Sequence, residues 1–215
     1  MRKSNKILLW GLIIASSMLL LQLLVLVVMN NEGLNLIDNG ISSALAQNRV
    51  RFFDFFFVIL SYLGETKTIA IFCIILLLLP NGKKLGVPVT ILTISSGIIN
   101  FLIKYLVLKT RPEGLFLTQS TLGYTFPTSY SFPSGHSQTA NLFYFSTALL
   151  FSNRLKYNYQ KNLLIFGTVI FCYLMSFGRI YLGVHFLSDV LAGICLMVAM
   201  ISVSILIYPK YKLIN

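Results

Sequence analysis

The stretch ILLWGLIIASSMLLLQLLVLVV, residues 7–28, decides the fold class of this chain. It contains no charged side chain, and it exceeds the ~20 residues that an α-helix needs to cross a bilayer. Arg2, Lys3 and Lys6 precede it. A signal peptide also begins with basic residues, but its apolar region is only about 7–15 residues long. We therefore predict that this stretch is a retained membrane-spanning helix.

The rest of the chain has the same character. Of its 215 residues, 56% are hydrophobic and 11% are charged, whereas soluble domains carry about 25% charged residues. This composition excludes most soluble folds, and disorder, which requires low hydrophobicity. A net charge of +11 suggests a nucleic-acid binder only where Lys and Arg gather on one face or arm. Here they are scattered between apolar runs, so we expect a membrane protein with no nucleic-acid partner.

The apolar runs predict an all-α polytopic membrane protein, a bundle of about six transmembrane helices in a single domain over residues 1–215. Each run is expected to be helical because the backbone must satisfy its own hydrogen bonds in hydrocarbon. The runs cover about residues 7–28, 67–79, 86–108, 134–151, 162–177 and 185–208. The second run is short, and its start can reach back before Gly64. An interfacial segment with short turns is expected over about 30–64, containing a short helix at 52–63, and an outer loop over about 113–132.

The basic residues predict the orientation. With six spans, both termini and the loops after the second and fourth spans lie on one side. That side carries no acidic residue and ten basic ones, namely Arg2, Lys3, Lys6, Lys83, Lys84, Arg154, Lys156, Lys161, Lys210 and Lys212. The positive-inside rule places this side in the cytoplasm. We therefore expect both termini to be cytoplasmic, in a bacterial cytoplasmic membrane, with the acids and both histidines on the outer side.

Two polar segments stand at the start of the outer loop and at its end. Lys104 and Arg111, in Lys104-x6-Arg111-Pro112, are almost two helical turns apart and can share a face. Taken alone, this segment is better explained by snorkelling at a helix end. In Pro133-Ser134-Gly135-His136, free N–H groups at a helix start can bind an anion. An ordinary helix entry with an incidental histidine is the alternative there.

A third polar segment, Gly178-Arg179-x5-His185-x3-Asp189, lies between the last two runs. Asp189 is one turn beyond His185 and can accept a hydrogen bond from its imidazole. A break near residues 181–183 would let Arg179 end one helix while His185 begins the next. A purely structural His–Asp contact is the alternative for this pair.

Taken together, the three segments favour phosphate chemistry. Cations and N–H groups stabilise the oxygens of a transferring phosphoryl group. The chain has only 2 histidines, so that one can attack and the other can protonate the leaving oxygen.

The three segments resemble the signature motifs of the type 2 phosphatidic acid phosphatase family, K-x6-R-P, P-S-G-H and S-R-x5-H-x3-D, whose core also resembles vanadium haloperoxidases. The resemblance implies a phosphohistidine on His185, orientation of that histidine by Asp189, and His136 as the general acid. It also implies a phosphate-binding set formed by Lys104, Arg111, Ser134, Gly135 and Arg179. No metal and no cofactor are implied.

Two positions depart from the family pattern. Gly178 replaces the serine before the last arginine, which removes a hydroxyl donor, and Glu113 stands where many relatives carry a second arginine. The resemblance predicts a lipid phosphatase acting on undecaprenyl pyrophosphate, phosphatidylglycerophosphate or phosphatidic acid, without choosing among them. Two alternatives stay open: a lipid-to-lipid phosphotransferase, and a non-enzymatic lipid-binding or transport protein on a degenerate scaffold.

Overall fold

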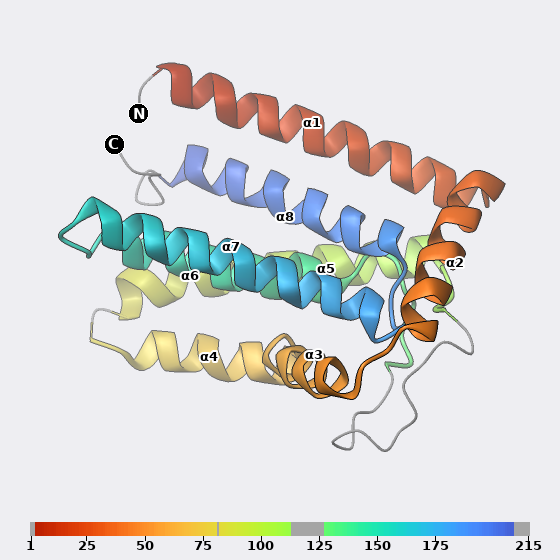
Figure 1. Cartoon of the computed structure of the whole chain (residues 1–215). Coiled ribbons are helices and arrows are strands. Elements are labelled where there is room, and N and C mark those ends of the chain that lie inside the picture. The colour runs from red at the N-terminus through yellow and green to blue at the C-terminus, as the bar shows by residue number, and fades with distance from the viewer. Residues whose placement is uncertain (1–2, 81, 113–126, 209–215) are drawn as a thin grey trace.

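The computed structural model describes residues 3–80, 82–112 and 127–208, and the regular structure in these ranges is helical (Figure 1). In chain order the helices are α1 (Lys3–Val28), α2 (Glu32–Gln47), α3 (Arg51–Leu63), α4 (Thr66–Leu78), α5 (Gly82–Val107), the π-helical turn η1 (His136–Ala140), α6 (Asn141–Ser152), α7 (Asn158–Tyr181) and α8 (Leu187–Ile207). The predicted all-α fold is confirmed.

Four of the described helices are long and apolar enough to cross a membrane, namely α1, α5, α7 and α8. Helices α3 and α4 are bent by 50° at Gly64 and make a fifth span if they cross as one unit. The predicted fourth span is helical from His136 to Ser152, which is shorter than the usual ~20 residues. The chain is thus a multi-pass membrane protein, but six spans are not confirmed.

Helix α6 and the turn η1 lie at the centre of the bundle. Leu142 and Leu149 of α6 are almost fully buried, as are Ser137 and Gln138 of η1. Helix α1, by contrast, lies along α8 at the outside of the bundle (Figure 1), and only three of its residues are buried. An apolar helix that stays exposed is stable in lipid and not in water, which agrees with the membrane fold.

Helix α2 differs from the expectation of short turns, because it is continuous from Glu32 to Gln47. The Asn31 side chain caps its start by accepting a hydrogen bond from the Leu34 N–H at 3.0 Å, which satisfies one of the free N–H groups of the first turn. Two polar residues, Asp38 and Ser42, form its buried face. Asp38, one of the charged residues that suggested turns, therefore lies on the packed side of a helix.

The helix ends sort into two groups (Figure 1). The start of α1, the end of α8 and the connections α4–α5 and α6–α7 lie at one end of the bundle. Helix α2, the α3–α4 bend and the α7–α8 connection lie at the other. This grouping matches the two sides predicted from charge, while the orientation in the membrane stays a prediction. Of the predicted outer loop, residues 113–126 lie outside the described residues.

Candidate active site

The turn between α7 and α8 brings the third motif together. Helix α7 ends at Tyr181, and Gly183 has a φ of 69°, a left-handed conformation that suits glycine. The N–H groups of Val184 and His185 both donate to the Arg179 carbonyl at 3.2 Å. The break predicted near residues 181–183 is therefore present, and it places His185 directly beside the end of α7.

His185 and Asp189 form a buried pair with exposed fractions of 2% and 0%. His185 Nδ1 lies 3.5 Å from Asp189 Oδ2 and 3.3 Å from Ser131 Oγ. The same carboxylate oxygen accepts hydrogen bonds from Ser131 Oγ and from the Phe186 N–H, the latter at 2.8 Å. A carboxylate can only accept, so it favours the tautomer with the proton on Nδ1. Nε2 then carries the free lone pair.

Arg111 faces that second nitrogen. Its Nη1 lies 3.2 Å from His185 Nε2 and donates to the Val184 carbonyl at 2.6 Å, while its Nε donates to the Ser129 carbonyl at 2.7 Å. The fixed guanidinium therefore marks where an anion would meet the imidazole. Burial, followed by the charges of Arg111, Lys104 and Arg179, holds the pKa of His185 well below its usual range. The imidazole is thus neutral at neutral pH, which is its nucleophilic form.

The other two predicted cations lie in the same cluster. Lys104 on α5 is 9% exposed, and its Nζ donates to the carbonyls of Tyr130 and of Ser131, the latter at 3.2 Å. Arg179 is 1% exposed, and its Nη1 donates to Ser61 Oγ at 2.7 Å. Burying such charges is costly unless a partner offsets them, so the cluster is suited to an anionic ligand.

His136 opens η1, and its Nε2 lies 3.0 Å from the Ser61 carbonyl oxygen. Since a carbonyl oxygen can only accept, this nitrogen carries a proton. Ser61 therefore contacts His136 through its carbonyl and Arg179 through its hydroxyl. Sequence reasoning missed Ser61, whose only signal was a hydroxyl inside the apolar run 52–63.

The segment before His136 is hydrogen-bonded to α8. The Ser134 N–H donates to the Asp189 carbonyl at 3.0 Å, and Ser134 Oγ accepts from Ser137 Oγ at 3.2 Å. Gly135 lines a cavity together with Lys104 and His136. The predicted phosphate-binding residues thus meet at one end of the bundle. Ser134 is held there by its own chain neighbours.

The departure at Gly178 has a steric explanation. A Cβ atom at this position would lie 2.7 Å from Phe57 Cδ1 and 3.2 Å from its Cγ. Position 178 therefore faces the aromatic ring of α3. The space that a serine side chain would need is already filled.

Gly178→Ser is expected to lower stability by about 1–3 kcal/mol through overpacking, without raising activity. Thermal unfolding in detergent and kcat/KM measure the two effects. Gly167→Ser in the same helix is the matched control, because a Cβ atom there has nothing within 4 Å. A more active Gly178→Ser variant with an unchanged Tm would show that a hydroxyl at this position can serve the site.

A cavity of about 690 Å³ extends from Lys104 and His136 along α4 and α5, and several of its lining residues, such as Ile74 and Ile94, are exposed at the surface of the bundle. Lys104, Ser129, Gly135 and His136 line its polar end. The remainder is lined mainly by apolar side chains, among them Ile69, Ile74, Leu77, Ile94 and Phe101, with a few threonines between them. The site therefore opens onto an apolar wall.

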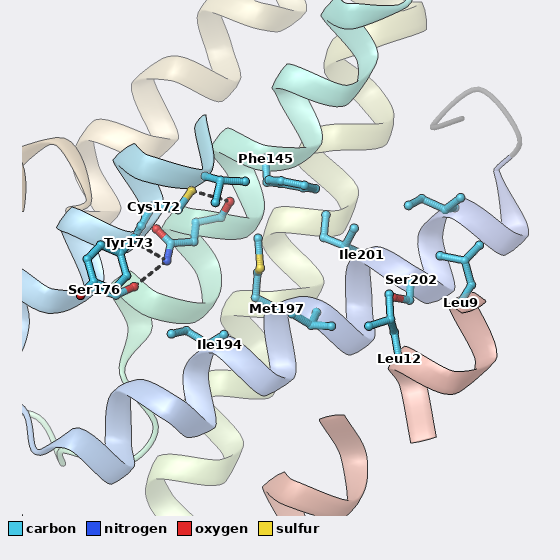
Figure 2. A pocket seen from close by; sticks show the side chains of 14 residues that line it. Leu9, Leu12, Phe145, Cys172, Tyr173, Ser176, Ile194, Met197, Ile201 and Ser202 are labelled. Carbon is cyan, nitrogen blue, oxygen red and sulfur yellow. Dashed lines mark hydrogen bonds between the residues drawn. The ribbon is translucent and has the colours of Figure 1, made fainter. Parts of the chain in front are cut away.

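A second cavity of about 410 Å³ lies between α1, α6, α7 and α8 (Figure 2). Its lining is mostly apolar, as Phe145, Met197 and Ile201 show, and it includes none of the predicted site residues. Of the predicted site residues, Lys104, Gly135 and His136 line the first cavity. Within residues 3–80, 82–112 and 127–208, no group of three His, Cys, Asp or Glu side chains is placed to hold a metal ion.

Comparisons with known proteins point in one direction. A family model described as the PAP2 superfamily matches residues 85–212, a range that includes all three motifs. The undecaprenyl-diphosphatase of Sulfolobus acidocaldarius is 30% identical over 119 residues, which make up 55% of this chain and 53% of that protein. Phosphatidylglycerophosphatase B of Bacillus subtilis is 41% identical over 70 residues, 32% of this chain and 34% of that protein. The chain thus matches about half the length of the first relative and a third of the second.

A crystal structure of a transmembrane PAP2-type phosphatidylglycerolphosphate phosphatase from Bacillus subtilis has the same fold. The TM-score is 0.78 at 22% sequence identity, over 93% of this chain and 98% of that one. The likeness therefore extends from the motifs to nearly the whole helical arrangement.

Proposed function

The chain belongs to the PAP2 superfamily, and we propose on this basis that it is a lipid phosphatase that releases inorganic phosphate from a lipid phosphate or pyrophosphate. The observation that carries the proposal is the cavity that joins Lys104 and His136 to the apolar wall between α4 and α5. A phosphate headgroup suits Lys104 at its polar end, and an acyl or isoprenoid chain suits the wall. A soluble phosphate ester would leave that wall unfilled.

In the proposed reaction, His185 Nε2 attacks phosphorus and the P–O bond to the leaving group breaks. His136 donates a proton to the leaving oxygen. His136 enters this step as an imidazolium, protonated on both nitrogens, a form that the negative charge of the bound phosphate favours. Its Nε2–H stays with the Ser61 carbonyl, so the transferred proton comes from Nδ1 and the ring is left neutral. The phosphorylated imidazole carries positive charge, which Asp189 stabilises. A water molecule then attacks phosphorus, His136 accepts its proton, and phosphate leaves with the N–P bonding pair returning to Nε2.

The names of the relatives suggest the substrate class. Undecaprenyl pyrophosphate and phosphatidylglycerophosphate are the candidates that they suggest, and phosphatidic acid shares the same phosphate headgroup chemistry. We further propose a bacterial cytoplasmic membrane with both termini in the cytoplasm and the site on the outer side. Described basic residues at the termini end of the bundle support this orientation, among them Lys3, Lys6 and Arg154.

The test is phosphate release by the purified protein from these three lipids, with a chelator present. Glycerol 3-phosphate serves as the matched soluble ester of phosphatidic acid. We expect a kcat/KM at least ~100-fold higher for a lipid than for the soluble ester, because burial of even a few methylene groups at ~0.8 kcal/mol each gives that preference. Label recovered on a second lipid instead of as free phosphate would identify a phosphotransferase. No turnover of any lipid would contradict the proposal.

A further inference from the structure

Asp189 has a second charged partner, Lys109, which occupies one of the unspecified positions of the first motif, Lys104-x6-Arg111. Lys109 Nζ is 3.1 Å from Asp189 Oδ1, the carboxylate oxygen that does not face His185. Lys109 follows the last residue of α5 closely, and its Nζ also lies 4.5 Å from the centroid of the Phe186 ring. The two oxygens of one carboxylate are thus divided between a lysine and the histidine.

Lys109 is in turn held by α2. Its Nζ lies 2.9 Å from Asp38 Oδ2 and donates to Ser188 Oγ at 2.7 Å. Asp38 Oδ1 accepts from the Ser188 N–H at 3.0 Å, and Asp38 Oδ2 accepts from Ser188 Oγ at 2.5 Å. Asp38 is 2% exposed and Ser188 is 1% exposed. The four residues form a closed network that joins α2, the end of α5 and the start of α8.

The network has a charge balance that affects the site. A lone ammonium beside Asp189 would offset the negative potential that the carboxylate presents to His185. Asp38 offsets the ammonium instead, so that Asp189 keeps its charge for the imidazole. Breaking a buried pair by removing one partner leaves the other charge uncompensated, and here that charge would act on His185.

We propose that Asp38 and Lys109 are positioning residues for the His185–Asp189 pair. Lys109 holds Asp189 Oδ1 so that Oδ2 points at His185 Nδ1, and Asp38 cancels the lysine's charge. This inference rests on the proposed function, since it assigns the network a role in the attack by His185.

The pH dependence of kcat/KM measures the charge balance directly, because its acid limb reports the protonation of His185 in the free enzyme. The charged and titratable groups that face His185 come from every neighbouring element. They are Lys104 on α5, Arg111 and Lys109 after α5, His136 on η1, Arg179 on α7 and Asp189 on α8. Asp38 on α2 acts through Lys109. In each variant, the charged groups around His185 that are not substituted stay the same, so a shift of the acid limb reports the substituted residue.

Asp38→Asn is expected to lower kcat about 10–100-fold with KM changed less than about twofold, as removal of an orienting outer partner commonly does. Its acid limb moves to lower pH, by on the order of one unit, because the uncompensated Lys109 disfavours the imidazolium. Lys109→Met moves the limb in the opposite direction, because Asp38 is then the uncompensated charge. Asp38→Asn/Lys109→Met returns the limb toward its wild-type position.

Glu32→Gln is the matched control, since it removes one exposed carboxylate from the same helix and leaves the limb in place. If Asp38 and Lys109 had a purely structural role, both single variants would have a changed kcat/KM or Tm, and their acid limbs would not move in opposite directions. If both single variants are active and their acid limbs lie at the wild-type pH, this inference is overturned and the proposed function is not. A wild-type protein that hydrolyses no lipid would instead contradict the proposed function.

Discussion

His185→Asn is expected to lower kcat/KM for phosphate release by about 10⁴-fold or more, the scale of loss seen when a nucleophilic or base residue is removed from a catalytic set. The reason is chemical: an amide nitrogen cannot form the N–P bond. Asparagine still fits between Asp189 and Arg111, which contact opposite nitrogens of the imidazole. Initial-rate measurements with the best lipid of the panel, in the presence of a chelator, give the ratio.

The same experiment has a direct readout of the intermediate. Brief exposure of the wild-type protein to a lipid labelled in its phosphate, followed by an alkaline quench, should leave acid-labile label on the protein. The His185→Asn variant should carry none. Phosphate release at the wild-type rate by a folded His185→Asn protein would eliminate the histidine mechanism. Strict dependence of the wild-type protein on a divalent metal would count equally against it.

Gly64→Ala is expected to lower kcat on the order of 10²-fold or more, although residue 64 has no functional group. A Cβ atom at this position would lie 2.9 Å from Met175 Sδ and 3.0 Å from His136 Nε2, and closer still to His136 Cδ2. The imidazole must therefore move away from the Ser61 carbonyl that holds it. Loss of a positioned general acid costs about 10²–10⁴-fold. Steady-state kinetics of the purified variant measure the loss.

Two comparisons show whether this loss passes through His136. Gly97 lines the same cavity, and a Cβ atom added there has nothing within 4 Å. The kcat of Gly97→Ala should therefore match that of the wild type. In a His136→Ala background, Gly64→Ala should cost little further activity, because the colliding ring is gone. Full additivity of the two losses would mean that Gly64 acts by another route, such as the bend between α3 and α4.

The membrane helices were predictable where the apolar pattern was long. The predicted runs 7–28 and 185–208 correspond to α1 and α8 with end residues that differ by at most four. Helix α2 was not predictable, because Glu32, Asp38 and Gly40 give it the composition of a loop. Its buried face depends on partners such as Ser188, which lies 150 residues further along the chain. Local sequence carries no information about that pairing.

The site residues also divide into those that the sequence could predict and those that only the structure shows. Lys104, Arg111, Arg179 and His185 were identifiable because their spacing within short motifs is distinctive, and the structure brings them together. Ser61, Asp38 and Lys109 are not signature residues of any motif. Ser61 and Lys109 contact the signature residues Arg179 and Asp189, which are distant in sequence, and Asp38 contacts Lys109. Their importance follows from geometry. The same holds for Gly178, whose missing side chain is explained only by the Phe57 ring of another helix.

The pairing between α2 and α8 also has a consequence for biogenesis. Asp38 emerges from the ribosome long before Ser188 and Asp189, which complete its network with Lys109. Until α8 arrives, Asp38 and Lys109 lack these α8 partners, and burying them would be unfavourable. Docking of α8 therefore completes the network, and the His185–Asp189 pair is positioned only after α8 has joined the bundle.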